Sequence, residues 1–450
     1  MLTYDNAVSR LYELGHELHG TPSHKFDLAH MRVLLEAIGH PERKFASLLI
    51  AGTNGKGSTA AMLASMLRAA GYRTGLYTSP HLVRINERIS ISGDRISDDD
   101  FAAVYSWVDA EAQRLVVEGR LPWHPSFFET VTAMCFEHFA NKGVQIAVLE
   151  VGMGGRLDAT NVVEPCVSVI TDISLDHQKF LGNTIAEIAA EKAGIVRKDR
   201  PTVTLPQHPQ ANDVLGRAII DAGARGVSAA RYVAPISPGA ETWYQRSAGR
   251  TRFQLTVIGE EIEIDTTLLG RHQLRNIALA ITAAEELAGC GFPITPKQVE
   301  QGIRETRWPG RFQVVPASGG RPELIFDVAH NPDGAWALRA ALSESFPERP
   351  VVVVFGAMRD KAISEIARVL FPIADRVIAT HAAHNPRAAA ADDIRMAGQE
   401  AGAEITTTPD VKTALERAFA DSREIPGSLV VVTGSIYIAG EAMQILGIEP

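Results

Sequence analysis

The sequence predicts an α/β protein that contains two mostly parallel sheets, each in a domain of its own. Short apolar runs alternate with amphipathic stretches of helical period through most of the 450 residues. Buried strands separated by helices are typical of a parallel sheet covered on both faces. This alternation is interrupted after residue 250 and begins again after residue 320. A chain of this length is also expected to contain more than one core.

Apolar runs in the first part of the chain are expected to be buried strands. They occupy residues 45–53, 74–80, 146–152, 167–173 and 201–206. The stretch 57–71 between the first two runs is amphipathic and predicts a helix. Apolar and polar residues alternate over 252–270 around a glycine-containing turn. That pattern predicts a small antiparallel hairpin appended to the same domain, followed by a helix at 276–291 that ends in glycines.

A second series of apolar runs predicts the sheet of a smaller C-terminal domain. These runs are 322–330, 350–358, 375–382, 403–409 and 427–435. Between the two series, Pro309 and Gly310 are adjacent and indicate a hinge. We therefore place the boundary near residue 300, with domains at 1–300 and 301–450.

Composition excludes several classes of partner. Hydrophobic residues make up 46% and charged residues 22%, as in ordinary globular proteins. The formal net charge of −9 disfavours non-specific binding to nucleic acid or to an anionic membrane. Cys135, Cys166 and Cys290 are far apart in the sequence and match no disulfide or metal spacing. The N-terminus has no signal-peptide pattern and no run is long enough to span a membrane, so we expect a cytoplasmic protein. We also expect a monomer.

The segment AGTNGKGSTAAML, residues 51–63, is close to a phosphate-binding loop but carries an extra glycine. The common form places Ser or Thr directly after the lysine, whereas Gly57 follows Lys56 here. A glycine-rich turn between a strand and a helix lets backbone N–H groups converge on phosphates. An incidental lysine in a glycine-rich turn is the alternative. The ATP-binding candidates are Gly52, Thr53, Asn54, Gly55, Lys56, Gly57, Ser58 and Thr59.

Seven blocks in order resemble the Mur-type ADP-forming ligases, in the form found in folylpolyglutamate and dihydrofolate synthases. They are GTNGKGS, TSPHLVRINERI, LEVGMGGRLDATN, ISLDHQKFLGNTIAEIAAEKAGI, GRHQLRNIALA, RWPGRF and DVAHNPDG, spread over most of the chain. The resemblance implies a P-loop ATPase domain with an antiparallel appendage and a Rossmann-like C-terminal domain. It also implies the substrates ATP and L-glutamate, with dihydropteroate or a folate as acceptor.

The same resemblance implies a site for Mg²⁺, expected to be two ions. Its ligands would be Ser79, Glu150 and His177, whereas Asp176 is expected to orient the loop. A strand-end carboxylate and a loop histidine exposed to solvent are the simpler interpretations of Glu150 and His177. Lys192 matches a lysine that the family often converts to N-carboxylysine, although an exposed helical lysine is the simpler interpretation.

The remaining groups are expected from residues later in the chain, most of them in the C-terminal domain. Asn276 and Arg311 resemble the family's adenine-side and γ-phosphate contacts, and Arg311 could swing onto the phosphate as the domains close. A linker salt bridge is the alternative for Arg311. By resemblance Asp327 holds the ATP ribose, and His330 and Ser435 lie near the incoming glutamate.

The folate side is implied by fewer residues. KFDLAHMR, residues 25–32, resembles a pterin-binding loop in which Asp27, Leu28 and Arg32 are retained. Ala29 and His30 replace Gly and Leu of that loop, which leaves the pterin preference open. Pro80 is a further candidate for contact with the substrate.

We expect an ATP-dependent ligase that adds glutamate to dihydropteroate and to folates through an acyl phosphate. A monofunctional folylpolyglutamate synthase is the alternative. A cell-wall Mur ligase would need an extra N-terminal domain, and only about 45 residues precede the loop strand. A GTPase is disfavoured because Val144 stands where N-K-x-D requires Asp. A non-catalytic relative would have lost site residues, which are present.

Overall fold

The structure is a computed structural model that describes residues 2–15, 28–234, 244–245, 249–383 and 385–449. The chain forms two compact units. The first comprises Met1–Ala234, Leu255–Ile262 and Asn276–Glu305, and the second comprises Pro235–Gln254, Glu263–Arg275 and Thr306–Pro450. None of the described helices is long and apolar enough to cross a membrane.

The first unit is built on an eight-stranded sheet. Its order is β4 (Asp94–Arg95), β3 (Ile89–Ile91), β2 (Thr74–Tyr77), β5 (Ile146–Glu150), β1 (Ala46–Ala51), β6 (Val167–Ile170), β7 (Pro201–Thr204) and β8 (Arg225–Ser228). Neighbouring strands in the series β2, β5, β1, β6, β7 and β8 pair in parallel, whereas β3 pairs antiparallel with β2 and with β4. The predicted parallel sheet is confirmed, and the short hairpin of β3 and β4 at its edge was not predicted.

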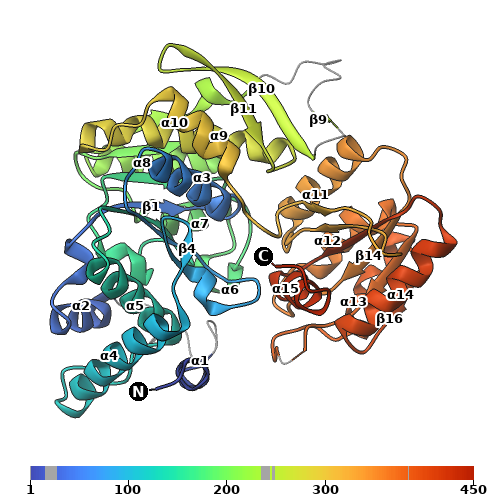
Figure 1. Cartoon of the computed structure of the whole chain (residues 1–450), viewed down its shortest axis with the longest axis horizontal. Helices are drawn as coiled ribbons and strands as arrows, with labels where there is room; N and C mark the ends of the chain where they lie inside the picture. The colour runs from blue at the N-terminus through green and yellow to red at the C-terminus, as the bar shows by residue number, and fades with distance from the viewer. Residues whose placement is uncertain (1, 16–27, 235–243, 246–248, 384, 450) are drawn as a thin grey trace. The chain divides into compact units, whose positions relative to one another are not determined.

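Helices connect and cover these strands (Figure 1). They are α1 (Tyr4–Glu13), α2 (Leu28–Ala37), α3 (Lys56–Ala69), α4 (Asp98–Val117), α5 (Phe127–Asn141), α6 (Gln178–Leu181), α7 (Ile185–Ala193), α8 (Pro209–Asp221), α9 (Arg271–Glu286) and α10 (Pro296–Glu305). The predicted helix at 276–291 begins earlier than expected, at Arg271, and ends in a short 3₁₀ helix, Leu287–Cys290.

Strand β1 is central in this sheet because its residues are almost entirely apolar. Leu48, Leu49, Ile50 and Ala51 are all fully buried between β5 and β6. A strand buried on both faces reads as a continuous apolar run rather than as an alternation. The loop that follows Ala51 is therefore held at the middle of the sheet's carboxyl edge, where open α/β sheets bind their ligands.

The alternating segment forms the expected hairpin, but not wholly within the first unit, to which only Leu255–Ile262 belongs. β10 (Arg250–Val257) and β11 (Glu260–Thr266) are adjacent in a three-stranded sheet, and β9 (Tyr244–Gln245) pairs antiparallel with β10 (Figure 1). The turn consists of Ile258 and Gly259, both with positive φ. Two such residues in succession give the type of turn that matches the twist of a hairpin.

The second unit contains a six-stranded sheet in the order β12 (Gln313–Val315), β13 (Glu323–Phe326), β17 (Leu429–Thr433), β14 (Val351–Phe355), β15 (Arg376–Ala379) and β16 (Ile405–Thr407). All neighbours pair in parallel except β12, which pairs antiparallel with β13. Its helices are α11 (Pro332–Ser345), α12 (Ile363–Leu370), α13 (Ala391–Gly398), α14 (Val411–Glu424) and α15 (Ile436–Ile445). The five predicted strands of this domain are confirmed, and β12 is an addition.

Candidate functional site

The glycine-rich loop is fixed by the chain segment that follows β6. The N–H groups of Thr53 and Asn54 donate to Asp172 O at 2.8 and 3.2 Å. The Thr53 hydroxyl donates to Ser174 O and accepts from Ser174 N, both at 3.1 Å. Because these contacts join neighbouring strands β1 and β6 at their carboxyl ends, the loop is rigidly placed before any ligand arrives.

Two glycines of the loop are required by close contacts. A Cβ atom on Gly52 would lie 1.7 Å from Thr171 Oγ1, and one on Gly55 would lie 2.2 Å from Asn276 Oδ1. Gly55 also has φ +90°, in the left-handed region that disfavours other residues. Asn276 is 3% exposed and lies on α9, so the structure brings this predicted ATP contact directly against the loop.

Helix α3 begins at Lys56 with its N-terminus open. Gly55 precedes it without a side-chain cap, and the first intrahelical hydrogen bond runs from Thr59 N to Gly55 O at 3.0 Å. The N–H groups before Thr59 therefore have no acceptor within the helix, which is the arrangement that binds phosphate. The Lys56 ammonium donates to Thr53 O at 3.2 Å, across the mouth of the loop. The Thr59 hydroxyl is buried and makes no hydrogen bond to another described residue.

Lys192 is a buried lysine whose side chain contacts the backbone of the glycine-rich loop. Only 3% of its surface is exposed, and its Nζ donates to Gly52 O at 2.7 Å. Burial lowers the pKa of Lys192 to about 7, with a further contribution from the charge of Lys56, against the opposing effect of Asp176 and Asp158. An amine with this pKa is largely uncharged at slightly alkaline pH and is then a nucleophile. The exposed helical lysine considered from the sequence is therefore wrong.

Glu150, Ser79 and Pro80 meet at the ends of adjacent strands β5 and β2. Glu150 is 5% exposed, and its Oε2 accepts a hydrogen bond from Ser79 N at 3.2 Å. The Ser79–Pro80 peptide bond is cis, and Pro80 is exposed. A solvated strand-end carboxylate is thereby excluded for Glu150.

His177 begins the short helix α6 in a left-handed conformation, with φ 50°. Its backbone N–H donates to Asp176 Oδ1 at 2.8 Å, and its Nε2 lies 3.8 Å from Asp176 Oδ2. The His177 side chain is 26% exposed and that of Asp176 is 8% exposed. Asp176 thus holds the backbone of His177 and also raises the pKa of Lys192 through its charge.

The side chains of Glu150 and His177 fit a cation that takes most of its ligands from water and from substrate phosphates. Among the described residues, no group of three or more His, Cys, Asp and Glu side chains could hold a metal ion. Mg²⁺ is normally bound by one or two carboxylates together with waters and substrate phosphates. The buried Glu150 carboxylate, near the open N-terminus of α3 on the same sheet edge, has the donor chemistry that this ion prefers.

The predicted pterin loop is only partly described. Asp27 lies outside the described residues, whereas Arg32 is exposed on α2. The charge of Arg32 contributes to lowering the pKa of the half-buried Arg197, after the larger effect of burial. His30 packs edge-to-face against Trp123, with ring centroids 4.8 Å apart. The substitution of Leu by His at this position therefore has a packing partner in this chain.

In the second unit, Asp327 ties the linker to the end of β13. Its Oδ2 accepts from Phe312 N at 2.9 Å, and its Oδ1 accepts from Ala329 N at 2.8 Å. Burial raises the pKa of Asp327, and the nearby charges of Arg311 and His330 oppose that rise. The structure therefore brings these three predicted site residues together.

His330 and Ser435 are both held by local backbone contacts. His330 Nδ1 lies 2.8 Å from Val328 O, and since a carbonyl oxygen only accepts, Nδ1 is the donor. Ser435 caps α15, since its hydroxyl accepts from Tyr437 N at 3.2 Å. Both residues follow strands of the same sheet, β13 and β17, which are paired in parallel. Their orientation is thus fixed by the fold of the second unit alone.

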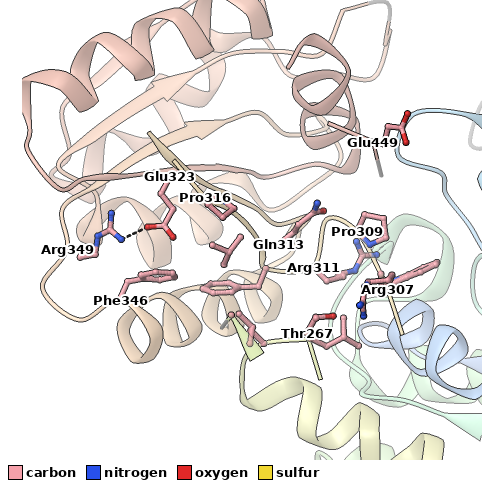
Figure 2. A pocket seen from close by; sticks show the side chains of 16 residues that line it. Thr267, Arg307, Pro309, Arg311, Gln313, Pro316, Glu323, Phe346, Arg349 and Glu449 are labelled. Atoms are coloured by element: carbon pink, nitrogen blue, oxygen red, sulfur yellow. Dashed lines mark hydrogen bonds and ion pairs between the residues drawn. The ribbon is translucent and has the colours of Figure 1, made fainter. Parts of the chain in front are cut away.

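A cavity of about 840 Å³ lies in the second unit. Figure 2 shows Arg307, Pro309 and Arg311 at one end and the Glu323–Arg349 ion pair at the other. Its volume is within the range of small-molecule pockets. Arg311, the predicted phosphate contact, therefore lines a concave surface where its guanidinium can face an anionic molecule.

Several residues around the loop were not singled out from the sequence. Asp172 and Ser174 hold the loop, and Asp158 is buried and accepts from Met153 N at 3.0 Å and from the Thr160 hydroxyl at 2.6 Å. Asp158 lies in the motif LDATN, where an Asp two residues before Thr is a signal for a local cap. Asp172 and Ser174 contact the loop only because β6 lies beside β1 in the sheet. No local sequence pattern reveals that the two strands are neighbours.

Comparison with protein families gives two matches that together cover most of the chain. The Mur ligase middle domain matches residues 104–284, and the Mur ligase glutamate ligase domain matches residues 310–436.

Individual proteins match over nearly the full length. The dihydrofolate synthase/folylpolyglutamate synthase of Bacillus subtilis (strain 168) is 35% identical over 426 residues, which cover 92% of this chain and 93% of that protein. A crystal structure of Mycobacterium tuberculosis folylpolyglutamate synthase complexed with ADP and AMPPCP superimposes with a TM-score of 0.87 at 34% identity, over 99% of this chain and 100% of that one. E. coli FolC in complex with DHPP and ADP gives a TM-score of 0.81 at 27% identity, over 99% of this chain and 98% of that one.

Proposed function

Because the chain belongs to the Mur ligase family, among its folylpolyglutamate and dihydrofolate synthases, we propose that it joins L-glutamate both to dihydropteroate and to reduced folates. The chain is an ADP-forming ligase that consumes ATP in adding glutamate to folates. The finer proposal covers the second acceptor, the acyl phosphate and the role of each residue. The observation that carries it is the glycine-rich loop, held between β6, α9 and Lys192 with the N-terminus of α3 open.

The first step is phosphoryl transfer from ATP to the acceptor carboxylate. The oxygen of the carboxylate attacks the γ-phosphorus, the bond to the β-phosphate oxygen breaks, and ADP leaves. Lys56 and the open N–H groups of α3 would stabilise charge on the transferring phosphoryl group. Arg311 is assigned the same task from the second unit. The glutamate amine then attacks the acyl phosphate, phosphate leaves, and an amide remains.

Mg²⁺, in our proposal two ions, would be held by Glu150, Ser79 and His177 and would supply neutralisation of phosphate charge. The depth of the Glu150 carboxylate and its contact with Ser79 N support this assignment. Asp176 would position His177 by accepting a hydrogen bond from the His177 backbone N–H. The buried hydroxyl of Thr59 is a further oxygen near the same helix N-terminus.

Lys192 is proposed to carry a carbamate. Its uncharged amine would attack carbon dioxide, forming a nitrogen–carbon bond and releasing one proton to solvent. The product would bear a negative charge in place of the positive one. Such an anion would be stabilised by Lys56, whose charge acts on Lys192 in the unmodified protein. The pKa near 7 supports the proposal, because the reaction requires the neutral amine.

The division of tasks follows the domains at 1–300 and 301–450. The first would hold ATP, with Asn276 on the adenine side, and Asp327 in the second would contact the ribose. His330 and Ser435 are proposed to hold the incoming glutamate. Their positions just after the paired strands β13 and β17 support a shared task.

The proposed test of function is product analysis. Purified protein is supplied with ATP, Mg²⁺ and L-glutamate, together with either dihydropteroate or tetrahydrofolate, and products are identified by mass. We expect one added glutamate on each acceptor, with release of ADP and phosphate. Formation of AMP and pyrophosphate would exclude the acyl phosphate, and acceptance of tetrahydrofolate alone would leave a monofunctional folylpolyglutamate synthase.

Two acceptors imply two positions of the pterin. The reacting carboxylate of a folate is one glutamate farther from the pterin than that of dihydropteroate, so one pterin position cannot present both. We assign Asp27 and Arg32 to the shorter substrate. Asp27→Ala is then expected to reduce ligation to dihydropteroate much more than ligation to tetrahydrofolate in steady-state assays. Equal loss of both activities would contradict the two positions.

A further inference from the structure

Two cysteines that are far apart in the sequence lie together in the first unit. Cys290 Sγ lies 3.7 Å from Cys166 O. Cys166 immediately precedes β6, and Cys290 ends the 3₁₀ helix that continues α9. Both residues are partly exposed, whereas Cys135 is fully buried. The pair therefore combines proximity with access for a small reagent.

The side chains of the two cysteines also interact. Burial raises the pKa of the Cys290 thiol to about 11, and the next largest effects come from Cys166. The charge of Arg200 acts in the opposite direction. Cys290 thus keeps its proton at neutral pH.

Open space lies beside the backbone on either side of Cys290. Cβ atoms on the flanking Gly289 and Gly291 would meet nothing within 4 Å. Cys166, in contrast, is anchored, since its N–H donates to Ser47 O at 2.7 Å. A disulfide has strict requirements for the separation and direction of its two Cβ atoms. The open space beside Cys290 leaves room for the small local shift that these requirements demand.

We propose that Cys166 and Cys290 form a reversible disulfide when the protein is exposed to hydrogen peroxide. The Cys166 thiolate attacks hydrogen peroxide, which gives a sulfenic acid and, after protonation, water. The Cys290 sulfur then attacks the sulfenic sulfur, its proton leaves with the hydroxyl as a second water, and the sulfur–sulfur bond forms. In total, two thiols and one peroxide give one disulfide and two waters.

The disulfide would connect the two elements that hold the glycine-rich loop. Strand β6 leads from Cys166 to Thr171 and Asp172, which contact Gly52 and Asn54. Helix α9 leads back from Cys290 to Asn276, which contacts Gly55. A bond at the far ends of these elements restrains them without touching the loop. Oxidation is therefore expected to stabilise the first unit against heat and to leave the loop intact.

The experiment compares reduced and peroxide-treated protein by intact mass, by alkylation with a maleimide under native conditions, and by thermal unfolding. Oxidised wild type should lose two hydrogen atoms in mass and two alkylatable thiols, and its unfolding midpoint should rise. A thiol reductant should reverse all three changes. Cys135→Ser should behave as wild type, whereas Cys166→Ser and Cys290→Ser should show neither the mass change nor the rise in midpoint.

Peptide mapping decides which sulfurs are joined. A Cys166–Cys290 cross-link in a monomer supports the proposal. A cross-link through Cys135, a disulfide between two chains, or sulfinic acids in place of a disulfide would overturn it. So would an unchanged mass at a peroxide concentration that oxidises the urea-unfolded chain.

Discussion

Replacement of Lys192 by Met is expected to stabilise the first unit near neutral pH while abolishing ligation. Lys192 is buried, and its pKa falls from the ordinary 10.5 to about 7. Methionine has similar length and no charge to desolvate. The cost of the substitution is the hydrogen bond from Nζ to Gly52 O, which is worth about 1 kcal/mol.

The size of the stabilisation depends on pH. With a pKa near 7 in the folded state and 10.5 in the unfolded state, the unfolded chain binds more protons between these values. The lysine therefore lowers stability most at and below pH 7, and this penalty is relieved as pH rises toward 10.5. From these pKa values, the penalty at pH 9 is smaller than at pH 7 by about 2 kcal/mol. The advantage of Lys192→Met over wild type should shrink by that amount.

The assay is hydrogen exchange of peptides from β1 and β6 at pH 7 and pH 9 in buffer free of carbon dioxide, which reports the unfolding free energy of this unit. Lys198→Met, at an exposed lysine, is the control and should leave both values unchanged. A gap between Lys192→Met and wild type that is the same at both pH values would refute the reasoning. It would show that Lys192 keeps its charge in the folded protein.

Three further substitutions, one of them with a matched control, test the loop and the metal. Lys56→Ala should remove most ligase activity, because the variant loses a positive charge placed at the transferring phosphate, while circular dichroism stays unchanged; near-normal turnover would exclude the phosphate role. His177→Ala should raise the Mg²⁺ concentration for half-maximal rate, and an unchanged Mg²⁺ dependence would make His177 a loop residue only. Gly55→Ala should weaken ATP binding measured by calorimetry, since the added Cβ would collide with Asn276. The control is Gly71→Ala, at a glycine with φ +86° and no atom within 4 Å of an added Cβ. It should cost about 1 kcal/mol of stability and leave ATP binding intact. Equal ATP affinity in the two glycine variants would show that the Asn276 contact is unimportant.

The fold could be predicted well from the sequence because its strands are apolar runs with short helical connections. β1 and the five parallel strands of the second unit all appeared where such runs stand. The β3–β4 hairpin was missed because strands of two or three residues carry too little pattern. The start of α9 at Arg271 was missed because its first turn is polar.

The candidate site was predictable where a motif is contiguous and not where it depends on strand order. Lys56 and Glu150 stand in recognisable segments. The burial of Lys192 could not be read from its helix, because it results from packing against the loop and against Gly155, whose Cβ would lie 3.0 Å from Lys192 O. Asp172 became visible only when β6 was found beside β1.

The attachment of the glycine-rich loop has a consequence for synthesis of the protein. Thr53 is held by Ser174, which is 121 residues later in the chain. Gly55 is packed against Asn276, farther still. Domains are completed as the ribosome releases them, and contacts distant in sequence form late. The glycine-rich loop is therefore synthesised early, but its nucleotide-binding conformation is complete only after α9 has emerged from the ribosome.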